Sequence, residues 1–203
     1  MSGNKDRLGE EFEACFGRLA AIGRDPAGGR TRLAWTDEDR AARAWFESEA
    51  SARGLAVDQD PAGNLWAWWG GSDNGPGGVV AVGSHLDTVR GGGAYDGALG
   101  VVSGLLAVGE LIGRGVEPRR PVAVVAFADE EGGRFGVPTF GSRLLTGALD
   151  REDVLGRADQ DGVTVARAMA EVGAGLVRHP FGGALAGLRY AAGLAATGAV
   201  GAA

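Results

Sequence analysis

The feature that most constrains the fold of this chain is a pair of short apolar runs that enclose a longer apolar stretch. The runs GGVVAVGS (77–84) and RRPVAVVAFADEE (119–131) have the length and composition of buried strands. The stretch 98–113 is apolar nearly all round, which predicts a buried helix. Strand, helix and strand in this order predict two parallel neighbouring strands. We therefore expect an α/β fold with a mostly parallel central sheet flanked by helices.

Further helices are predicted on both sides of this unit. Apolar residues recur on one helical face in the range 8–22. A second helix begins after Thr36, a good N-cap that acidic residues follow, and ends at Gly54. Shorter helices are expected at 141–146 and 163–172.

The segment LAVDQDPAGNLWAWWG (55–70) predicts a strand, a turn and a second strand, because DPAGN carries turn-forming residues. Trp66 and Trp68 are two residues apart on the second strand and so share one face of it. We interpret them as part of a packed face rather than as a stacking surface for a ligand.

Composition narrows the classes of partner. The formal charge of −6 argues against a nucleic-acid partner, which needs a basic face. The single cysteine, Cys15, cannot form a disulfide within the chain and is interpreted as core filling. No apolar run reaches the ~20 residues of a membrane span, and the N-terminus lacks a signal-peptide core. We expect a cytoplasmic protein without membrane or nucleic-acid partners.

Residues with metal-binding chemistry follow the two predicted strands. His85, one of only two histidines, ends the first strand, and Glu130 and Glu131 end the second. Asp96 precedes the connecting helix. The carboxyl ends of parallel neighbours meet at one edge of a sheet, so these side chains should converge. Each signal alone has an ordinary structural interpretation, but their joint order favours a common site.

A gathering of carboxylates is costly without a cation, because like charges repel and some groups are driven to protonate. Imidazole and carboxylate ligands suit Zn²⁺, with Mn²⁺ and Co²⁺ as alternatives. One carboxylate can bridge two ions about 3.5–4 Å apart. We expect two divalent metal ions. Asp87, two residues after His85, is placed to accept the second ring N–H of that histidine and orient it.

Four segments carry a resemblance to a known family: TRLAWTDEDRAAR, DPAGNLWA, GSHLDTVRGGGAYDGALGV and FADEEGGRFGVPTFGSRLLTG. Together they resemble the N-terminal part of N-carbamoyl-L-amino-acid hydrolases, β-ureidopropionases and allantoate amidohydrolases, over residues 8 to about 180. EEGGRF separates this branch from dipeptidases and ordinary aminoacylases. The resemblance implies the phosphorylase/hydrolase-like catalytic domain of zinc exopeptidases. It also implies hydrolysis of a C–N bond in a small carbamoyl or ureido substrate.

The resemblance further implies a role for each site residue. His85 binds one metal ion, Asp96 bridges both ions, and Glu131 binds the other. Glu130 is the general base that takes a proton from the attacking water. Asp87 orients His85. The residues that bind the substrate remain unknown at this stage.

Family members continue beyond the point that this chain reaches. They carry a second histidine ligand in a segment similar to HIEQGP, then a lid and dimerisation domain, and a third histidine ligand; full-length relatives are homodimeric. The second histidine of this chain, His179, has surroundings that do not match and is not expected to be a ligand. We therefore expect residues 1–181 to form a partial metallohydrolase catalytic domain without the lid and dimerisation domain.

The segment 182–203 has a different composition. Fifteen of its 22 residues are Gly or Ala, and Arg189 is its only charge. It is expected to be a poorly ordered tail, produced by truncation or by a shifted reading frame.

Two functional interpretations remain open. The chain is either the catalytic part of a hydrolase of linear amides or a non-catalytic remnant that folds without turnover. A dipeptidase of the same superfamily is disfavoured by EEGGRF. Metal content and turnover distinguish the first two, and we expect the chain alone to bind metal weakly and to hydrolyse poorly or not at all.

Overall fold

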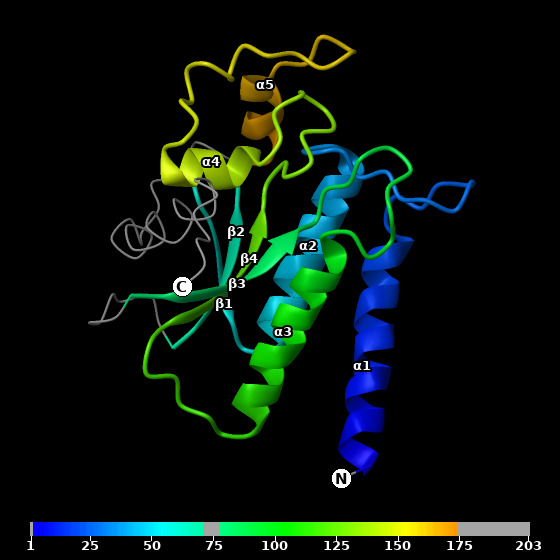
Figure 1. Cartoon of the computed structure of the whole chain (residues 1–203), viewed down its shortest axis with the longest axis vertical. Coiled ribbons are helices and arrows are strands. Elements are labelled where there is room, and N and C mark those ends of the chain that lie inside the picture. Colours follow the sequence, from blue (N-terminus) through cyan, green and yellow to red (C-terminus); the bar gives the residue numbers. More distant parts are fainter. Residues whose placement is uncertain (1, 71–77, 174–203) are drawn as a thin grey trace, which may run out of the picture.

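The computed structural model describes residues 2–70 and 78–173, which contain a four-stranded sheet with helices packed against it (Figure 1). The strands are β1 (Ala56–Gln59), β2 (Leu65–Trp69), β3 (Val80–His85) and β4 (Val122–Phe127). The helices are α1 (Ser2–Ala21), α2 (Asp37–Ala52), α3 (Ala98–Gly113), α4 (Phe140–Thr146) and α5 (Val165–Glu171). The predicted tail 182–203 and His179 lie outside the described residues.

The strand order is β1-β2-β4-β3, and the predicted crossover unit is confirmed. β3 and β4 are parallel, with His85 opposite Phe127, and α3 connects them. The expected α/β class is confirmed, but the expectation of a mostly parallel sheet needs correction. Among the described strands, β2 pairs antiparallel with both β1 and β4. The short turn between β1 and β2 permits only antiparallel pairing within that hairpin, and no second strand–helix–strand crossover lies on the β2 side of β4 among the described residues.

The long helices cover one face of the sheet. α2 and α3 contact the strands, and α1 packs on the outside against both of these helices (Figure 1). Residues of all three helices share one core with the inward side chains of β2 and β4. α3 is less buried than its composition predicts. It keeps an exposed stripe in which Leu99 and Leu111 are 44% and 41% exposed. None of the helices described here has both the length and the apolar character needed to cross a bilayer.

The opposite face of the sheet carries the predicted tryptophan pair. Trp66 and Trp68 are buried, and their rings stack with centroids 5.7 Å apart. They pack with Ala123 and Val125 of β4. The interpretation of Trp66 and Trp68 as a packed face is confirmed, because alternate residues of β2 point to opposite sides.

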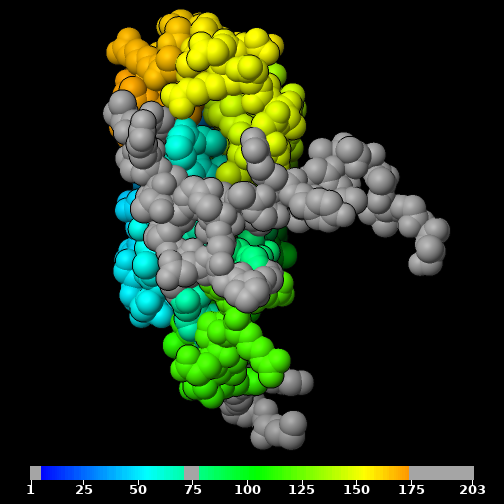
Figure 2. All heavy atoms as spheres, turned by 90° about the vertical axis from the view of Figure 1, so that its left-hand side faces the viewer, coloured from blue at the N-terminus to red at the C-terminus, as the bar shows by residue number. Residues whose placement is uncertain are grey.

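A second core lies beyond the carboxyl ends of the strands. Trp35, Phe135 and Phe140 meet there, with the Trp35 and Phe140 rings edge to face at 5.2 Å. α4, α5 and the segments around them close this core, and Figure 2 shows this part of the chain, yellow to orange, gathered at one end of the molecule. The predicted helices at 141–146 and 163–172 are confirmed as α4 and α5. α4 begins one residue earlier than predicted, and α5 begins two residues later and ends one residue earlier.

One buried side chain ties the β1–β2 turn to the end of β4. Asn64 accepts a hydrogen bond from the Ala128 amide at 2.9 Å and donates to the Gly141 carbonyl at 3.1 Å. It also donates to the carboxylate of Asp60 at 2.8 Å. These bonds hold the backbone immediately before the Asp129–Glu130–Glu131 segment, so the turn helps to position the site.

Cys15 lies in the core between α1 and α2 and is fully buried. Its Sγ donates to Glu49, which also pairs with Arg18 and Arg53 at 2.7 and 2.8 Å. Burial, reinforced by the negative charge of Glu49, raises the pKa of the Cys15 thiol to about 11. The interpretation of Cys15 as core filling agrees with this position.

We expect native Cys15 to resist alkylation. The thiolate is the reactive form, so a thiol pKa raised to about 11 slows the reaction at pH 8 about 100-fold relative to an ordinary cysteine, and poor access of the reagent to the buried thiol slows it further. Iodoacetamide labelling followed by mass spectrometry would measure the rate, with the guanidinium-unfolded chain as the control. Equal rates in the folded and unfolded chain would contradict this account of the core.

Candidate metal centre

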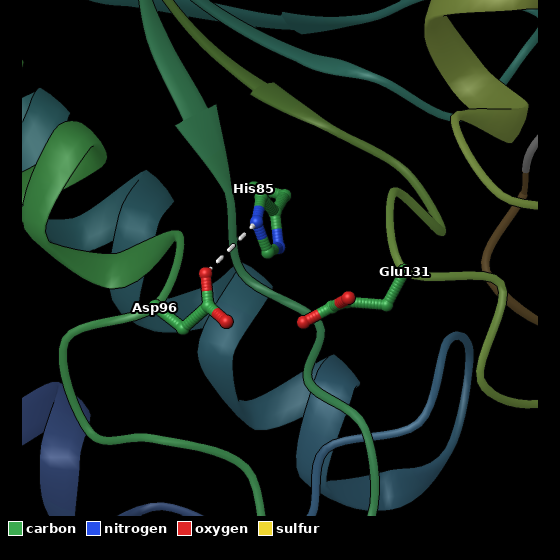
Figure 3. Close-up of side chains that lie close together, drawn as sticks. All are labelled: His85, Asp96 and Glu131. Carbon is green, nitrogen blue, oxygen red and sulfur yellow. Dashed lines mark ion pairs between the residues drawn. The ribbon is translucent and has the colours of Figure 1, made fainter.

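Three side chains from separate elements meet at the carboxyl ends of the parallel strands. His85 is the last residue of β3, Asp96 lies two residues before α3, and Glu131 lies four residues after β4. One ligand atom from each of the three lies within 4.8 Å of the others. In Figure 3 the carboxylates of Asp96 and Glu131 approach the His85 ring from opposite sides. The predicted convergence of these residues is therefore observed in the structure.

A glycine allows the Asp96 loop to approach the histidine. Gly97 has φ +64°, a left-handed conformation that favours glycine, and it packs directly on the His85 ring. A Cβ at this position would lie 2.5 Å from Cε1 of the ring. The close contact brings Oδ1 of Asp96 to 3.8 Å from Nε2 of His85. The Asp96 side chain remains 60% exposed, so the centre is open to solvent on this side.

The two nitrogens of the His85 ring have different surroundings. Nδ1 lies 3.0 Å from the backbone carbonyl oxygen of Asp87, which can only accept a hydrogen bond. Nε2 faces Asp96 and also Glu130, whose carboxylate is 3.6 Å away. With the proton on Nδ1, the lone pair of Nε2 points at the carboxylates, as a metal ligand requires.

Negative charge dominates the centre. Burial opposes protonation of His85, but the carboxylates of Asp87 and Glu130 outweigh it and raise the pKa of the imidazole to about 9. Burial and then the charge of Asp96 raise the pKa of Glu131. A divalent cation bound among these groups would oppose both shifts. The donor set of one imidazole and two carboxylates therefore fits a divalent metal ion such as Zn²⁺.

Asp129 adds a further buried carboxyl behind the centre. It is 1% exposed and has φ +48°, which is uncommon for a residue other than glycine. Burial, followed by the charges of Asp87 and Asp39, raises its pKa to about 8. Asp129 therefore gives up its proton less readily than an ordinary aspartate.

The carboxylate of Asp87 has partners beyond the predicted one. Its Oδ1 lies 3.6 Å from Nδ1 of His85, an ion-pair distance rather than that of a normal hydrogen bond, and its charge raises the pKa of the imidazole. Both of its oxygens also accept backbone N–H groups, from Glu130 and Glu131, at 3.1 Å each. No sequence pattern signals this contact, because the donors are main-chain groups 43 and 44 residues away.

Comparison with known proteins shows what this chain is similar to. The model of peptidase family M28 matches residues 64–154. The chain is 42% identical over 165 residues to N-carbamoyl-L-amino acid amidohydrolase of Geobacillus stearothermophilus, over 81% of this chain and 40% of that protein. It is 37% identical over 157 residues to allantoate amidohydrolase of Bacillus subtilis, over 77% of this chain and 38% of that protein.

A solved structure agrees with these sequence matches. A hydantoinase/carbamoylase family amidase from Burkholderia ambifaria superposes with a TM-score of 0.77 at 38% identity, over 82% of this chain and 40% of that protein. The chain thus spans about two fifths of the length of the relatives it matches. By sequence and by fold, the chain is similar to the amidohydrolases N-carbamoyl-L-amino acid amidohydrolase and allantoate amidohydrolase.

Proposed function

We propose that this chain supplies the metal-binding catalytic part of a hydrolase that cleaves a C–N bond in N-carbamoyl amino acids or ureido compounds. The observation that carries the proposal is the convergence of His85, Asp96 and Glu131 within 4.8 Å, beside Glu130. The names of the relatives, a carbamoyl-amino-acid amidohydrolase and an allantoate amidohydrolase, support the substrate class. The chain spans about two fifths of the length of those relatives.

Each residue of the centre has a distinct task in this proposal. His85, Asp96 and Glu131 hold the metal, with Zn²⁺ favoured by the donor set and Mn²⁺ or Co²⁺ as alternatives. Asp96 is exposed enough to offer its two oxygens to two ions. A bound divalent ion would supply Lewis-acid polarisation of the carbamoyl or ureido oxygen.

Glu130 is the proposed general base. Its carboxylate is 36% exposed, so solvent and substrate can reach it, and it lies 3.6 Å from Nε2 of His85. From there it can accept a proton from the attacking water and return it to the leaving nitrogen. Its backbone amide is held by Asp87, which leaves the side chain free for this task.

A peptidase is the second candidate, because the M28 peptidase model matches residues 64–154. That range contains the strands β2, β3 and β4 and the three candidate metal ligands, which a peptidase and an amidohydrolase of this fold would share. The amidohydrolase relatives match about four fifths of the chain, a wider range, and so favour a non-peptide substrate. Parallel assays with N-carbamoyl amino acids, allantoate and dipeptides would separate the two.

Metal binding by the chain itself tests the proposal first. We expect the purified chain to bind Co²⁺, seen as visible absorption, and Zn²⁺, seen by calorimetry. Glu131→Gln should weaken the affinity at least about tenfold, since loss of even an outer-shell partner typically costs this much. Glu117→Gln, an exposed glutamate in the α3–β4 connection, is the matched control and should bind as the parent does. A parent chain that binds neither metal would refute the proposal.

A further inference from the structure

The two halves of the candidate centre come from different strands and need a connection. His85 belongs to β3, whereas Glu130 and Glu131 follow β4 in a segment outside regular structure. The pairing of β3 with β4 fixes the two strands relative to one another only up to Phe127, which lies opposite His85. Beyond that point, other contacts must set where the two glutamates lie relative to the histidine.

Asp87 makes such a contact with both oxygens of its carboxylate. Oδ1 accepts the backbone N–H of Glu130 and Oδ2 accepts that of Glu131, at 3.1 Å each. The Asp87 side chain is 3% exposed, so water competes little for these bonds. Hydrogen bonds to an ionised acceptor are stronger than neutral ones and have narrower geometry. Two of them on consecutive amides define both the position and the direction of the segment.

The orientation of His85 depends on a different group of the same residue. Nδ1 lies 3.0 Å from the Asp87 backbone carbonyl, compared with 3.6 Å from its carboxylate. A side-chain substitution at Asp87 therefore leaves the nearest partner of Nδ1 in place. The two roles of Asp87, towards the histidine and towards the glutamates, can be separated by experiment.

We propose that the carboxylate of Asp87 is a positioning group for Glu130 and Glu131 that holds the β4 half of the centre at a fixed place relative to the β3 half. The inference rests on the proposed function, because it explains how that site is assembled. It gives the side chain of Asp87 a role towards the glutamate segment, in addition to its charge interaction with His85, whose Nδ1 faces the backbone carbonyl. The aspartate thus acts through its neighbours and touches neither metal nor substrate.

The test uses Asp87→Asn in the intact chain. An asparagine has the same shape, but its amide nitrogen cannot accept an N–H, so one of the two backbone amides loses its partner. We expect hydrogen exchange of the Glu130 or Glu131 amide to become about tenfold faster or more, and Co²⁺ to bind about 10–100-fold more weakly. The ¹⁵N resonance of Nδ1 of His85 should remain that of a protonated ring nitrogen. Asp150→Asn, an exposed carboxylate that accepts the Glu152 amide, should leave all three readouts unchanged.

Several outcomes would overturn the inference. One is loss of the proton from Nδ1 of His85 in Asp87→Asn while the glutamate amides stay protected, which would assign the carboxylate to the histidine. Another, which needs no variant and so survives a folding failure, is exchange of both amides at free-peptide rates in the parent chain. A parent chain that binds no Co²⁺ would defeat the proposed function, whereas the amide exchange would still decide the role of Asp87.

Discussion

Glu130→Gln is expected to lower turnover by about 10²–10⁴-fold in a catalytically active form of this protein while leaving metal content unchanged. Glutamine keeps the size of the side chain but cannot accept a proton from the attacking water. The same substitution at the equivalent glutamate of a full-length relative gives a direct assay, with ammonia release as the measurement of turnover. Metal content measured by atomic emission completes the experiment.

Asp96→Ala is the matched comparison for this prediction. Asp96 is one of the three residues whose ligand atoms converge, so its removal should release metal as well as abolish turnover. If Asp96→Ala alone lost activity while both variants kept their metal equally, the proposed roles of Asp96 and Glu130 would be reversed.

Gly83→Ala is expected to destabilise the fold by more than about 4 kcal/mol, which is close to the whole stability of many domains. Gly83 lies in β3 opposite Val125 of β4, with φ +157°. A Cβ at this position would lie 1.9 Å from the Val125 carbonyl oxygen and 2.8 Å from its nitrogen. The backbone of β4 would have to move away, and the strand pairing that delivers His85 to the centre would be lost.

Thermal and urea unfolding followed by circular dichroism would measure this effect. Val82→Ala is the control. Val82 precedes Gly83 on the same strand, and its side chain is 45% exposed and contributes little packing. A Gly83→Ala variant that melts within a few degrees of the parent chain would show that β3 and β4 can separate locally at little cost.

The elements of this fold follow closely from local sequence patterns. The predicted helix at 98–113 coincides with α3, and Thr36 caps α2 by accepting the Asp39 amide, as its position predicts. The hairpin at 55–70 forms β1 and β2 around the DPAGN turn. Caps, turns and periodicity act over a few residues, so neighbours along the chain suffice to specify them.

The arrangement of the elements was harder to predict. The sequence predicts β3 and β4 as parallel neighbours, but it carries no signal that β2 enters the sheet antiparallel beside β4. Likewise, the composition of α3 predicts full burial, whereas Leu99 and Leu111 are exposed. Burial depends on which other elements lie nearby, and apolar content alone does not identify them.

The candidate centre could likewise be predicted from the sequence only in part. The order of His85, Asp96, Glu130 and Glu131 around a strand–helix–strand unit suffices to predict that these residues meet, because parallel strands bring their carboxyl ends to one edge. The contacts of the Asp87 side chain with the glutamate amides, and of its carbonyl with Nδ1, became visible only in the folded chain. The reason is that hydrogen bonds to main-chain groups depend on the path of the backbone through space, and every residue type offers the same amide.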